Sequence, residues 1–207
     1  ALSQNGHRHV VEQLHLKSGD RVLDIGVGTG CALDHFPKDV DVVGLDFSEG
    51  MLTQAVRRCA KRQLSHCHLV RANAMQPPLA HQSFDHVIVS HTISVVSDPA
   101  RLLHWAARLV KPHGRVILRN HFQSDQPWIA WFEKVLNPLF MKLGWRSDLS
   151  LEEVLAQTDM QMDYRFKKSL FDFWQIVVLT HRRKSRLLAD PPLIDSKPFP
   201  VSQPVAG

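Results

Sequence analysis

The stretch Val22-Leu23-Asp24-Ile25-Gly26-Val27-Gly28-Thr29-Gly30 decides the fold of this 207-residue chain. Its apolar start is typical of a buried β-strand, and the glycines at every second position after it are typical of a turn with a bare backbone. Because such a backbone can lie directly against a bound molecule, the stretch predicts a ligand site at the end of the first strand.

The spacing of the glycines distinguishes two kinds of nucleotide cofactor. A dinucleotide fingerprint has its third small residue one position later, where this chain has Cys31, so the pattern is G-x-G-x-G and not G-x-G-x-x-G. This spacing favours S-adenosylmethionine over NAD. A tight strand-to-helix connection without any ligand can also use three glycines, so the turn alone does not establish a cofactor site.

A second predicted strand, residues 41–46, ends on a carboxylate. Asp46 lies roughly 20 residues after the first glycine of the turn, the separation at which an acidic side chain reaches ribose hydroxyls. A carboxylate at a strand end can also cap the following helix, but Ser48 is available for that task. We therefore predict that Asp46 binds a ribose.

With these two motifs the chain resembles the class I S-adenosylmethionine-dependent methyltransferases, whose glycine-rich motif is matched by Asp24, Gly26, Gly28 and Gly30. The resemblance implies an α/β fold that is Rossmann-like and doubly wound, with a mostly parallel seven-stranded sheet and an antiparallel last strand. It implies that Gly26 and Gly28 lie under the methionine part of the cofactor. It also implies that Asp46 holds the ribose and that Phe47, the next residue, belongs to the cofactor site.

Two later segments complete the expected site. Asn73 and Ala74, after the third strand, occupy positions that contact the adenine edge in the resembled family. Ser90 and His91 come at the end of the fourth strand, and ligands of an open parallel sheet gather outside the carboxyl ends of its strands. A helix expected after Gly30 would direct its positive N-terminus toward the cofactor carboxylate.

The remaining elements are predicted from apolar periodicity and turn residues. Helices are expected over residues 6–16, 48–63, 99–110 and 151–157, with Asp98 capping the third of them. Strands are expected over residues 22–25, 41–46, 67–71, 84–90 and 116–118, followed by an antiparallel pair over residues 160–166 and 174–180.

Composition predicts one globular domain, residues 1–186, because 44% of the chain is hydrophobic and no second core is needed. Residues 187–207 are proline-rich without periodicity, so we expect a disordered tail. The sequence contains no apolar run of about 20 residues. Residues 1–9 lack the apolar core of a signal peptide, and we expect a cytoplasmic protein.

The cysteines and histidines do not form a metal-binding pattern. Cys31, Cys59 and Cys67 are scattered and odd in number, so we expect reduced thiols. His66 and His68 flank Cys67, but alternate side chains of a strand point to opposite faces, and we expect no metal site there.

Two segments suggest contact with a membrane surface. Residues 127–143 carry a helical stripe of apolar side chains, including Trp128, Trp131 and Phe132, which is either core or a lid that contacts lipid. Residues 181–186 form a basic cluster in a chain of net charge +5. A positively charged protein favours anionic surfaces, which include phospholipid headgroups and nucleic acid, and the charge does not decide between them.

Three short segments, residues 91–99, 120–122 and 143–149, look more like the soluble bacterial phosphatidylethanolamine N-methyltransferases than like methyltransferases in general. The resemblance implies successive methyl transfers to a headgroup amine by a peripheral enzyme at the inner, anionic membrane face, with no nucleic-acid partner. His91 and His121 are the candidates for taking the ammonium proton or binding the lipid phosphate. A methyltransferase for a quinone or another small molecule, and a non-catalytic cofactor-binding protein, remain alternatives.

Overall fold

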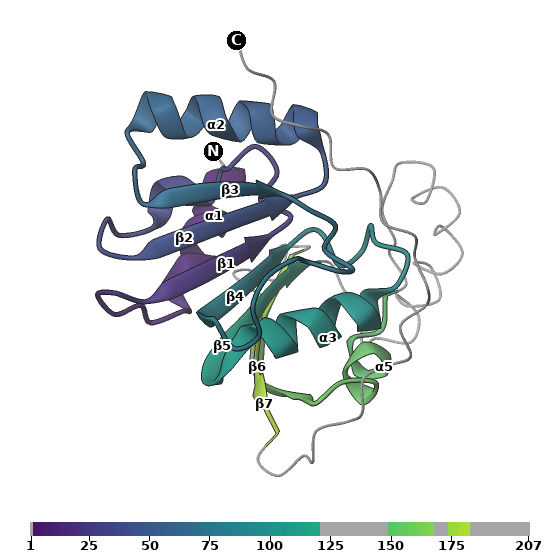
Figure 1. Ribbon diagram of the computed structural model, residues 1–207. Helices are drawn as coiled ribbons and strands as arrows, with labels where there is room; N and C mark the ends of the chain where they lie inside the picture. The colour runs from purple at the N-terminus through teal and green to yellow at the C-terminus, as the bar shows by residue number, and fades with distance from the viewer. Residues whose placement is uncertain (1, 121–148, 168–173, 183–207) are drawn as a thin grey trace.

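The computed structural model describes residues 2–120, 149–167 and 174–182. Seven strands of this part of the chain form one twisted sheet in the order β3-β2-β1-β4-β5-β7-β6 (Figure 1). The strands are β1 Arg21–Ile25, β2 Asp41–Asp46, β3 Cys67–Arg71, β4 Phe84–Ser90, β5 Val110–Asn120, β6 Met160–Lys167 and β7 Gln175–His181. Strand β7 runs antiparallel to both of its neighbours, β5 and β6, and the other strand pairs are parallel, so the predicted fold class is confirmed.

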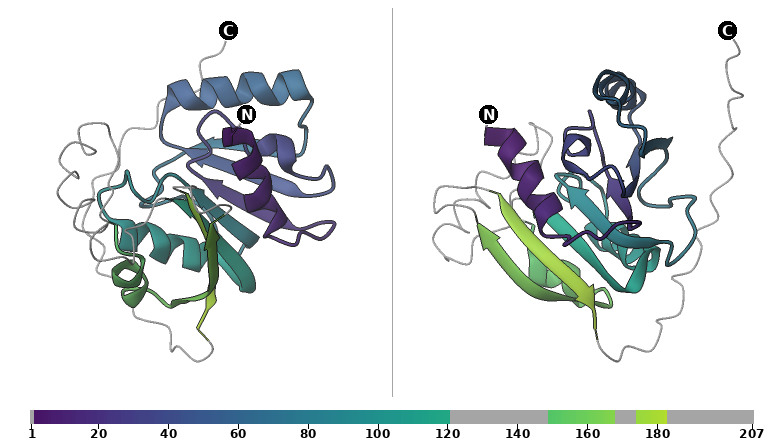
Figure 2. Two further views of the ribbon diagram at one scale, coloured as in Figure 1. Left: turned by 180° about the vertical axis from the view of Figure 1, so that it is seen from behind. Right: turned by 90° about the vertical axis from the view of Figure 1, so that its left-hand side faces the viewer.

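Helices cover both faces of the sheet, which is the doubly wound arrangement (Figures 1 and 2). One face carries α1 Leu2–Glu12, α2 Glu49–Arg62 and the short 3-10 helix η1 Leu33–His35. The other face carries α3 Pro99–Leu109 and α5 Leu151–Ala156.

Strand side chains alternate between two buried apolar clusters, one on each face of the sheet. On the α1 face, Ile88 of β4 and Ile117 of β5 pack in one cluster with Val10 of α1. On the α3 face, Val87 of β4 packs in the other cluster with Leu103 of α3. This two-sided burial explains why the central strands read as continuous apolar runs in the sequence.

Side chains at the helix starts end up as predicted. The Ser48 hydroxyl accepts a hydrogen bond from the Met51 amide at 3.4 Å, and the Asp98 carboxylate accepts one from the Arg101 amide at 2.9 Å. Each contact satisfies an amide that the helix itself leaves without a partner.

Two local expectations need correction. The segment after Gly30 forms only the 3-10 helix Leu33–His35, because Pro37, two residues after its end, has no amide hydrogen with which to continue a helix. Strand β5 begins at Val110 instead of residue 116. Residues 111–114 bulge within it, since Phe84 pairs with Val110 while His86 pairs with Arg115.

Several predicted features lie outside the described residues: His121, the aromatic stripe of residues 127–143, most of the basic cluster and the tail from residue 187. Within the described ranges, no helix is long and apolar enough to cross a bilayer.

Candidate functional site

The candidate site lies at the carboxyl ends of β1, β2, β4 and β5. The chain leaves β1 toward β2 on one side, whereas β4 pairs with β1 on its other side. This reversal of strand order opens a crevice at the carboxyl edge, the usual ligand position in such sheets. Asp46, Ser90 and Asn120 end three of these strands, and the glycine turn comes after the fourth.

The glycine turn is held by backbone contacts and needs its glycines. The amide of Gly26 donates to the Leu45 carbonyl at 2.7 Å, which ties the turn to β2. Gly26, Gly28 and Gly30 have φ angles of 77°, 56° and 76°, a region that favours glycine. A Cβ at Gly26 would also overlap the Thr92 side chain, so the segment after β4 packs directly on the turn.

Asp46 connects the two sequence motifs. One carboxylate oxygen accepts the Gly28 amide at 2.8 Å, and the other accepts the Ser48 amide at 2.8 Å. Each carboxylate oxygen has two lone pairs, so both can still accept hydrogen bonds from ribose hydroxyls. The structure therefore brings Asp46 and the glycine turn together as expected.

Asp24 is a buried carboxyl group beneath the turn. Only 2% of the residue is exposed, and its Oδ1 has no hydrogen-bond partner among the described residues. Burial, and then the nearby charge of Asp46, raise the pKa of Asp24 to about 7. An unpaired buried carboxyl oxygen is costly in isolation, and a ligand that carries an amino group would satisfy it.

The adenine end of the expected cofactor site is formed by the segments that follow β2 and β3. Phe47 is 71% exposed, which leaves its ring available to stack on a planar base. The Asn73 carboxamide accepts the Met75 amide at 2.9 Å, and the Ala72 amide donates to the Asp46 carbonyl at 3.1 Å. These bonds hold Asn73 and Ala74 in a turn next to the end of β2.

The residues present fit S-adenosylmethionine. The bare turn at Gly28 offers backbone, Asp46 offers acceptors for ribose, and Phe47 offers a ring face. Asp24 and the buried Ser90 hydroxyl each have an oxygen without a hydrogen-bond partner among the described residues. Polar groups buried without partners are rare in native proteins, and a bound ligand is one of the explanations for them.

His91, at the end of β4, lies beside a buried arginine to which the sequence alone assigned no role. The Nη1 of Arg119 is 2.8 Å from the Nε2 of His91, and the His91 amide donates to the Arg119 carbonyl at 2.8 Å. Burial, and then the charge of Arg119, lower the pKa of His91 to about 4. The ring of Trp174 packs edge-on against His91, with 4.1 Å between centroids.

Sequence reasoning missed Thr92, Arg119 and Trp174. A usable signal existed for Arg119, since a charged residue directly continues the buried run of residues 116–118. A charge at the end of an apolar parallel strand points to the ligand edge of the sheet. Trp174 is brought there only by the antiparallel pairing of β7 with β5, which no local pattern shows.

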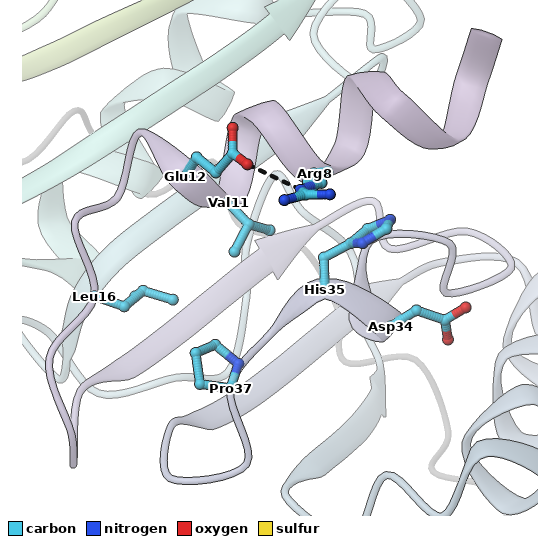
Figure 3. Close-up of a pocket in the computed structure, with 7 residues that line it drawn as sticks. All are labelled: Arg8, Val11, Glu12, Leu16, Asp34, His35 and Pro37. Atoms are coloured by element: carbon cyan, nitrogen blue, oxygen red, sulfur yellow. Dashed lines mark hydrogen bonds and ion pairs between the residues drawn. The ribbon is translucent and has the colours of Figure 1, made fainter. Parts of the chain in front are cut away.

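A separate depression of about 570 Å³ lies between α1 and the segment after β1 (Figure 3). Arg8 and Glu12 of α1, joined by a hydrogen bond of 2.9 Å, face His35 and Pro37 across it. None of the expected cofactor residues lines this depression, so it is distinct from the carboxyl-edge site.

Comparisons with known proteins identify the family of the chain. Residues 23–118, which contain the glycine turn, Asp46 and β4, match the methyltransferase domain family. The chain is 32% identical over 162 residues to a phosphatidylethanolamine N-methyltransferase of Cereibacter sphaeroides, covering 78% of this chain and 79% of the relative. It is 34% identical over 156 residues to a demethylmenaquinone methyltransferase of Lactiplantibacillus plantarum, covering 69% of this chain and 65% of that protein.

A solved structure shows the same fold. The YcgJ protein of Bacillus subtilis superposes with a TM-score of 0.69 at 21% identity, over 78% of this chain and 72% of that one. Because the Cereibacter relative is matched over most of its length, the likeness extends well beyond the cofactor motif. The chain belongs to the S-adenosylmethionine-dependent methyltransferases.

Proposed function

We propose that this methyltransferase transfers methyl groups to the headgroup amine of phosphatidylethanolamine and its methylated intermediates, toward phosphatidylcholine. The observation that carries the proposal is the match to the Cereibacter enzyme, which extends over 79% of that protein. The demethylmenaquinone methyltransferase of Lactiplantibacillus is matched over 65% of its length. A demethylmenaquinone methyltransferase of Staphylococcus haemolyticus is matched over 72% of its length. The share of the relative that is matched is therefore larger for the Cereibacter enzyme than for either quinone enzyme.

The geometry is compatible with a polar acceptor. Beside the cofactor residues, the carboxyl edge carries His91 and Arg119, and Ser94 donates a buried hydrogen bond of 3.0 Å to the Asn120 carboxamide. A guanidinium charge and hydrogen-bonding side chains at this edge complement a charged headgroup better than they complement the ring of a quinone.

The reaction requires little covalent chemistry from the protein. When bound, S-adenosylmethionine would supply a methyl group on a positively charged sulfur. The amine nitrogen would bond to the methyl carbon in line with the carbon–sulfur bond, which breaks and releases S-adenosylhomocysteine. The glycine turn and Asp46 fix the position of the cofactor, and alignment of the reacting groups accounts for most of the acceleration. The amine must be neutral to react. Of the two histidines expected to take its proton, His91 already accepts a hydrogen bond from Arg119 through Nε2, and in this proposal His121 accepts the proton.

Methylation of a quinone is the second candidate, and the 34% identity to the Lactiplantibacillus enzyme favours it. The two candidates share every cofactor residue, so cofactor binding cannot separate them. They differ in the acceptor, because phosphatidylethanolamine presents an amine and a phosphate, whereas a demethylated quinone presents neither.

A direct assay separates the two acceptors. The full chain is incubated with S-adenosylmethionine labelled in its methyl group, together with either phosphatidylethanolamine vesicles or demethylmenaquinone, and the extracted lipids are chromatographed. We expect label in mono-, di- and trimethylated phospholipid. An Asp46→Ala variant serves as the control for label that transfers without the cofactor site. Label in the quinone alone would contradict the proposal.

A phospholipid acceptor also requires access to a bilayer. We therefore propose peripheral association with an anionic membrane face, supported by the net charge of +5 and by the aromatic and basic segments of the sequence. Sedimentation with vesicles of defined charge tests this association independently of methyl transfer.

A further inference from the structure

We propose that Arg119 is the anion-recognition residue of the acceptor site, where it binds the phosphodiester of the headgroup, and that His91 is its positioning residue. The inference rests on the proposed function, because it assigns the phosphate of that acceptor to a residue. It differs from the expectation drawn from the sequence, in which a histidine alone handled the proton or the phosphate.

Arg119 is a buried charged side chain at the ligand edge of the sheet. It is the penultimate residue of β5, and only 5% of it is exposed. Sites that bind phosphate often use arginine, because its planar fork of donors matches the oxygens of the anion.

His91 fixes the direction of this guanidinium. Its Nε2 accepts from the Arg119 Nη1 at 2.8 Å, and its own amide donates to the Arg119 carbonyl at 2.8 Å. His91 has a φ of 58°, a left-handed conformation that non-glycine residues adopt rarely and mostly at functional sites. Two contacts to one neighbour, one from the backbone and one from the side chain, therefore hold a strained residue in place.

Among the described residues, the positive charge at this edge comes from Arg119 and not from His7 or His91. A nitrogen that accepts a hydrogen bond from arginine carries no proton, and the lowered pKa of His91 agrees with a neutral ring. The ring of His7 on α1 lies 6.3 Å from that of His91, and burial, and then Arg119, lower the pKa of His7 to about 4. Both histidines are therefore neutral at physiological pH and leave anion attraction to the guanidinium.

Helix α1 and strand β7 close around the same group. A Cβ at Gly6 of α1 would overlap the guanidinium of Arg119, so the helix backbone approaches the group as closely as a glycine allows. The Arg119 guanidinium carbon lies 5.8 Å from the ring centroid of Trp174, within the range of a cation–π interaction. The surroundings of the guanidinium are thus built from three separate parts of the chain.

The position on the sheet points to the acceptor and not to the cofactor. The expected cofactor residues lie mainly after β1, β2 and β3, whereas Arg119 lies on β5, with β4 between it and β1. Neighbouring strands are about 4.8 Å apart. In phosphatidylethanolamine two carbons separate amine and phosphate, a span comparable to one strand spacing. A phosphate held at β5 therefore leaves the amine near the end of β4, beside the glycine turn.

Binding of a soluble headgroup tests the inference without depending on turnover. Calorimetry measures the affinity of the full chain, saturated with S-adenosylhomocysteine, for glycerophosphoethanolamine and for ethanolamine, which lacks the phosphate. The variants are Arg119→Met, Arg119→Lys and His91→Asn, the last because asparagine tolerates a left-handed backbone. Arg115→Met is the matched control, an arginine on the same strand whose Nη1 donates to the Gln13 carbonyl at 3.1 Å.

We expect Arg119→Met to weaken glycerophosphoethanolamine binding at least tenfold. Arg119→Lys should lose less of this affinity, and Arg115→Met should bind as the wild type does. Ethanolamine affinity should be the same in all four variants. His91→Asn should raise the acceptor KM in the methylation assay more than it lowers kcat, and should leave the pH profile of kcat unchanged, because a positioning residue carries no proton in the reaction.

The outcomes separate this inference from the proposed function. If the wild type binds glycerophosphoethanolamine through Arg119 but transfers no methyl group to phosphatidylethanolamine, only the proposed function fails. If phosphatidylethanolamine is methylated while Arg119→Met binds the headgroup normally, only this inference fails. Loss of S-adenosylhomocysteine affinity in both Arg119 variants would assign the arginine to the cofactor carboxylate and overturn the inference as well. Absence of wild-type headgroup binding would also overturn it.

Discussion

Asp46 shows how one side chain can serve the fold and the cofactor together. Its carboxylate accepts the amides of Gly28 and Ser48, so it fixes the glycine turn and the start of α2 before any ligand arrives. A residue that contacted only the ribose would contribute nothing to the stability of the protein without cofactor. We therefore expect substitutions at this position to affect both stability and cofactor affinity.

Asp46→Ala should weaken S-adenosylmethionine binding by about tenfold to a hundredfold, because hydrogen bonds to a charged acceptor contribute about 1.5–3 kcal/mol. Calorimetry measures the dissociation constant directly. Asp41→Ala is the matched control, since Asp41 begins the same strand and pairs at 2.9 Å with Arg21, away from the site. An unchanged dissociation constant in a folded Asp46→Ala protein would remove Asp46 from the cofactor site.

Asp24 makes stability depend on pH in an unusual direction for a carboxyl group. Burial raises its pKa from 3.8 to about 7, so the folded protein holds a proton that the unfolded chain releases above about pH 4. The stabilising contribution is complete below pH 3.8 and is lost as the pH rises through 7. At 1.36 kcal/mol per pKa unit the full loss is about 4 kcal/mol.

Asp24→Asn removes this ionisation with little change in shape. The free energy of unfolding of the variant, relative to the wild type, should therefore increase between about pH 4 and pH 7 and then stay constant. Urea unfolding of both proteins at several pH values measures this difference, and other titrating groups cancel because the two proteins share them. Two parallel curves would show that Asp24 titrates in the folded protein as it does in the unfolded chain.

At the scale of elements, the glycine turn allows a comparison of backbone strain with steric overlap. Gly26 and Gly28 both have positive φ angles, but a Cβ at Gly26 would overlap the Thr92 side chain, whereas one at Gly28 would meet nothing closer than 3.9 Å. Alanine in the left-handed region costs roughly 1–2 kcal/mol at either position. The overlap adds to this cost only at Gly26.

Gly26→Ala should therefore lower the free energy of unfolding more than Gly28→Ala, by about 1–3 kcal/mol beyond the strain that both share. Chemical denaturation without cofactor measures the stabilities. The double variant Gly26→Ala/Thr92→Ala, compared with Thr92→Ala alone, tests the cause, because removal of the threonine hydroxyl, whose oxygen overlaps the added Cβ, should recover part of the loss. Equal losses of unfolding free energy in the two single variants would mean that the segment after β4 moves to make room for the added Cβ.

The elements that the sequence predicted well are those whose signal is local and strong. The glycine turn, Asp46 at the end of β2 and the caps Ser48 and Asp98 all depend on residues close together in the chain. The expected helix after Gly30 was wrong. It was expected from the resemblance to the family, whereas Pro37 in this sequence prevents a longer helix. Strand β5 was predicted too short, because Pro112 and Gly114 indicate a turn locally, whereas pairing with β4 carries the strand past them.

Tertiary contacts explain the parts of the site that the sequence could not show. The pairing of Arg119 with His91 joins residues 28 positions apart, and Trp174 reaches them only through β7. The lowered pKa of His91 results from burial among these residues. A histidine at a strand end suggests acid–base chemistry from the sequence, but its hydrogen-bond partner decides which nitrogen can take part.

At the scale of the whole molecule, the proposed substrate requires a protein that moves to a bilayer surface. Two clusters of three basic residues each can be compared. Arg57, Lys61 and Arg62 are exposed near the end of α2, where basic side chains also complement the helix dipole. Arg183, Lys184 and Arg186 belong to the basic cluster of the sequence, outside the described residues. The proposal favours the second set.

We expect the full chain to sediment with vesicles in a way that increases with anionic lipid content and decreases with added salt. The triple variant Arg183→Gln/Lys184→Gln/Arg186→Gln should lose binding, since each basic residue near an anionic leaflet contributes about 1 kcal/mol. The matched control Arg57→Gln/Lys61→Gln/Arg62→Gln removes the same charge from α2 and should bind nearly as the wild type does, apart from a general loss of attraction.

A second variant, Trp128→Ala/Trp131→Ala, separates insertion from electrostatic attraction, because aromatic side chains at the headgroup boundary bind largely independently of salt. It should lower binding at high salt more than at low salt. If both triple variants lose binding equally, net charge alone attracts the protein and the basic cluster has no special role. Equal sedimentation with neutral and anionic vesicles, or none with either, would contradict an electrostatic route to the membrane.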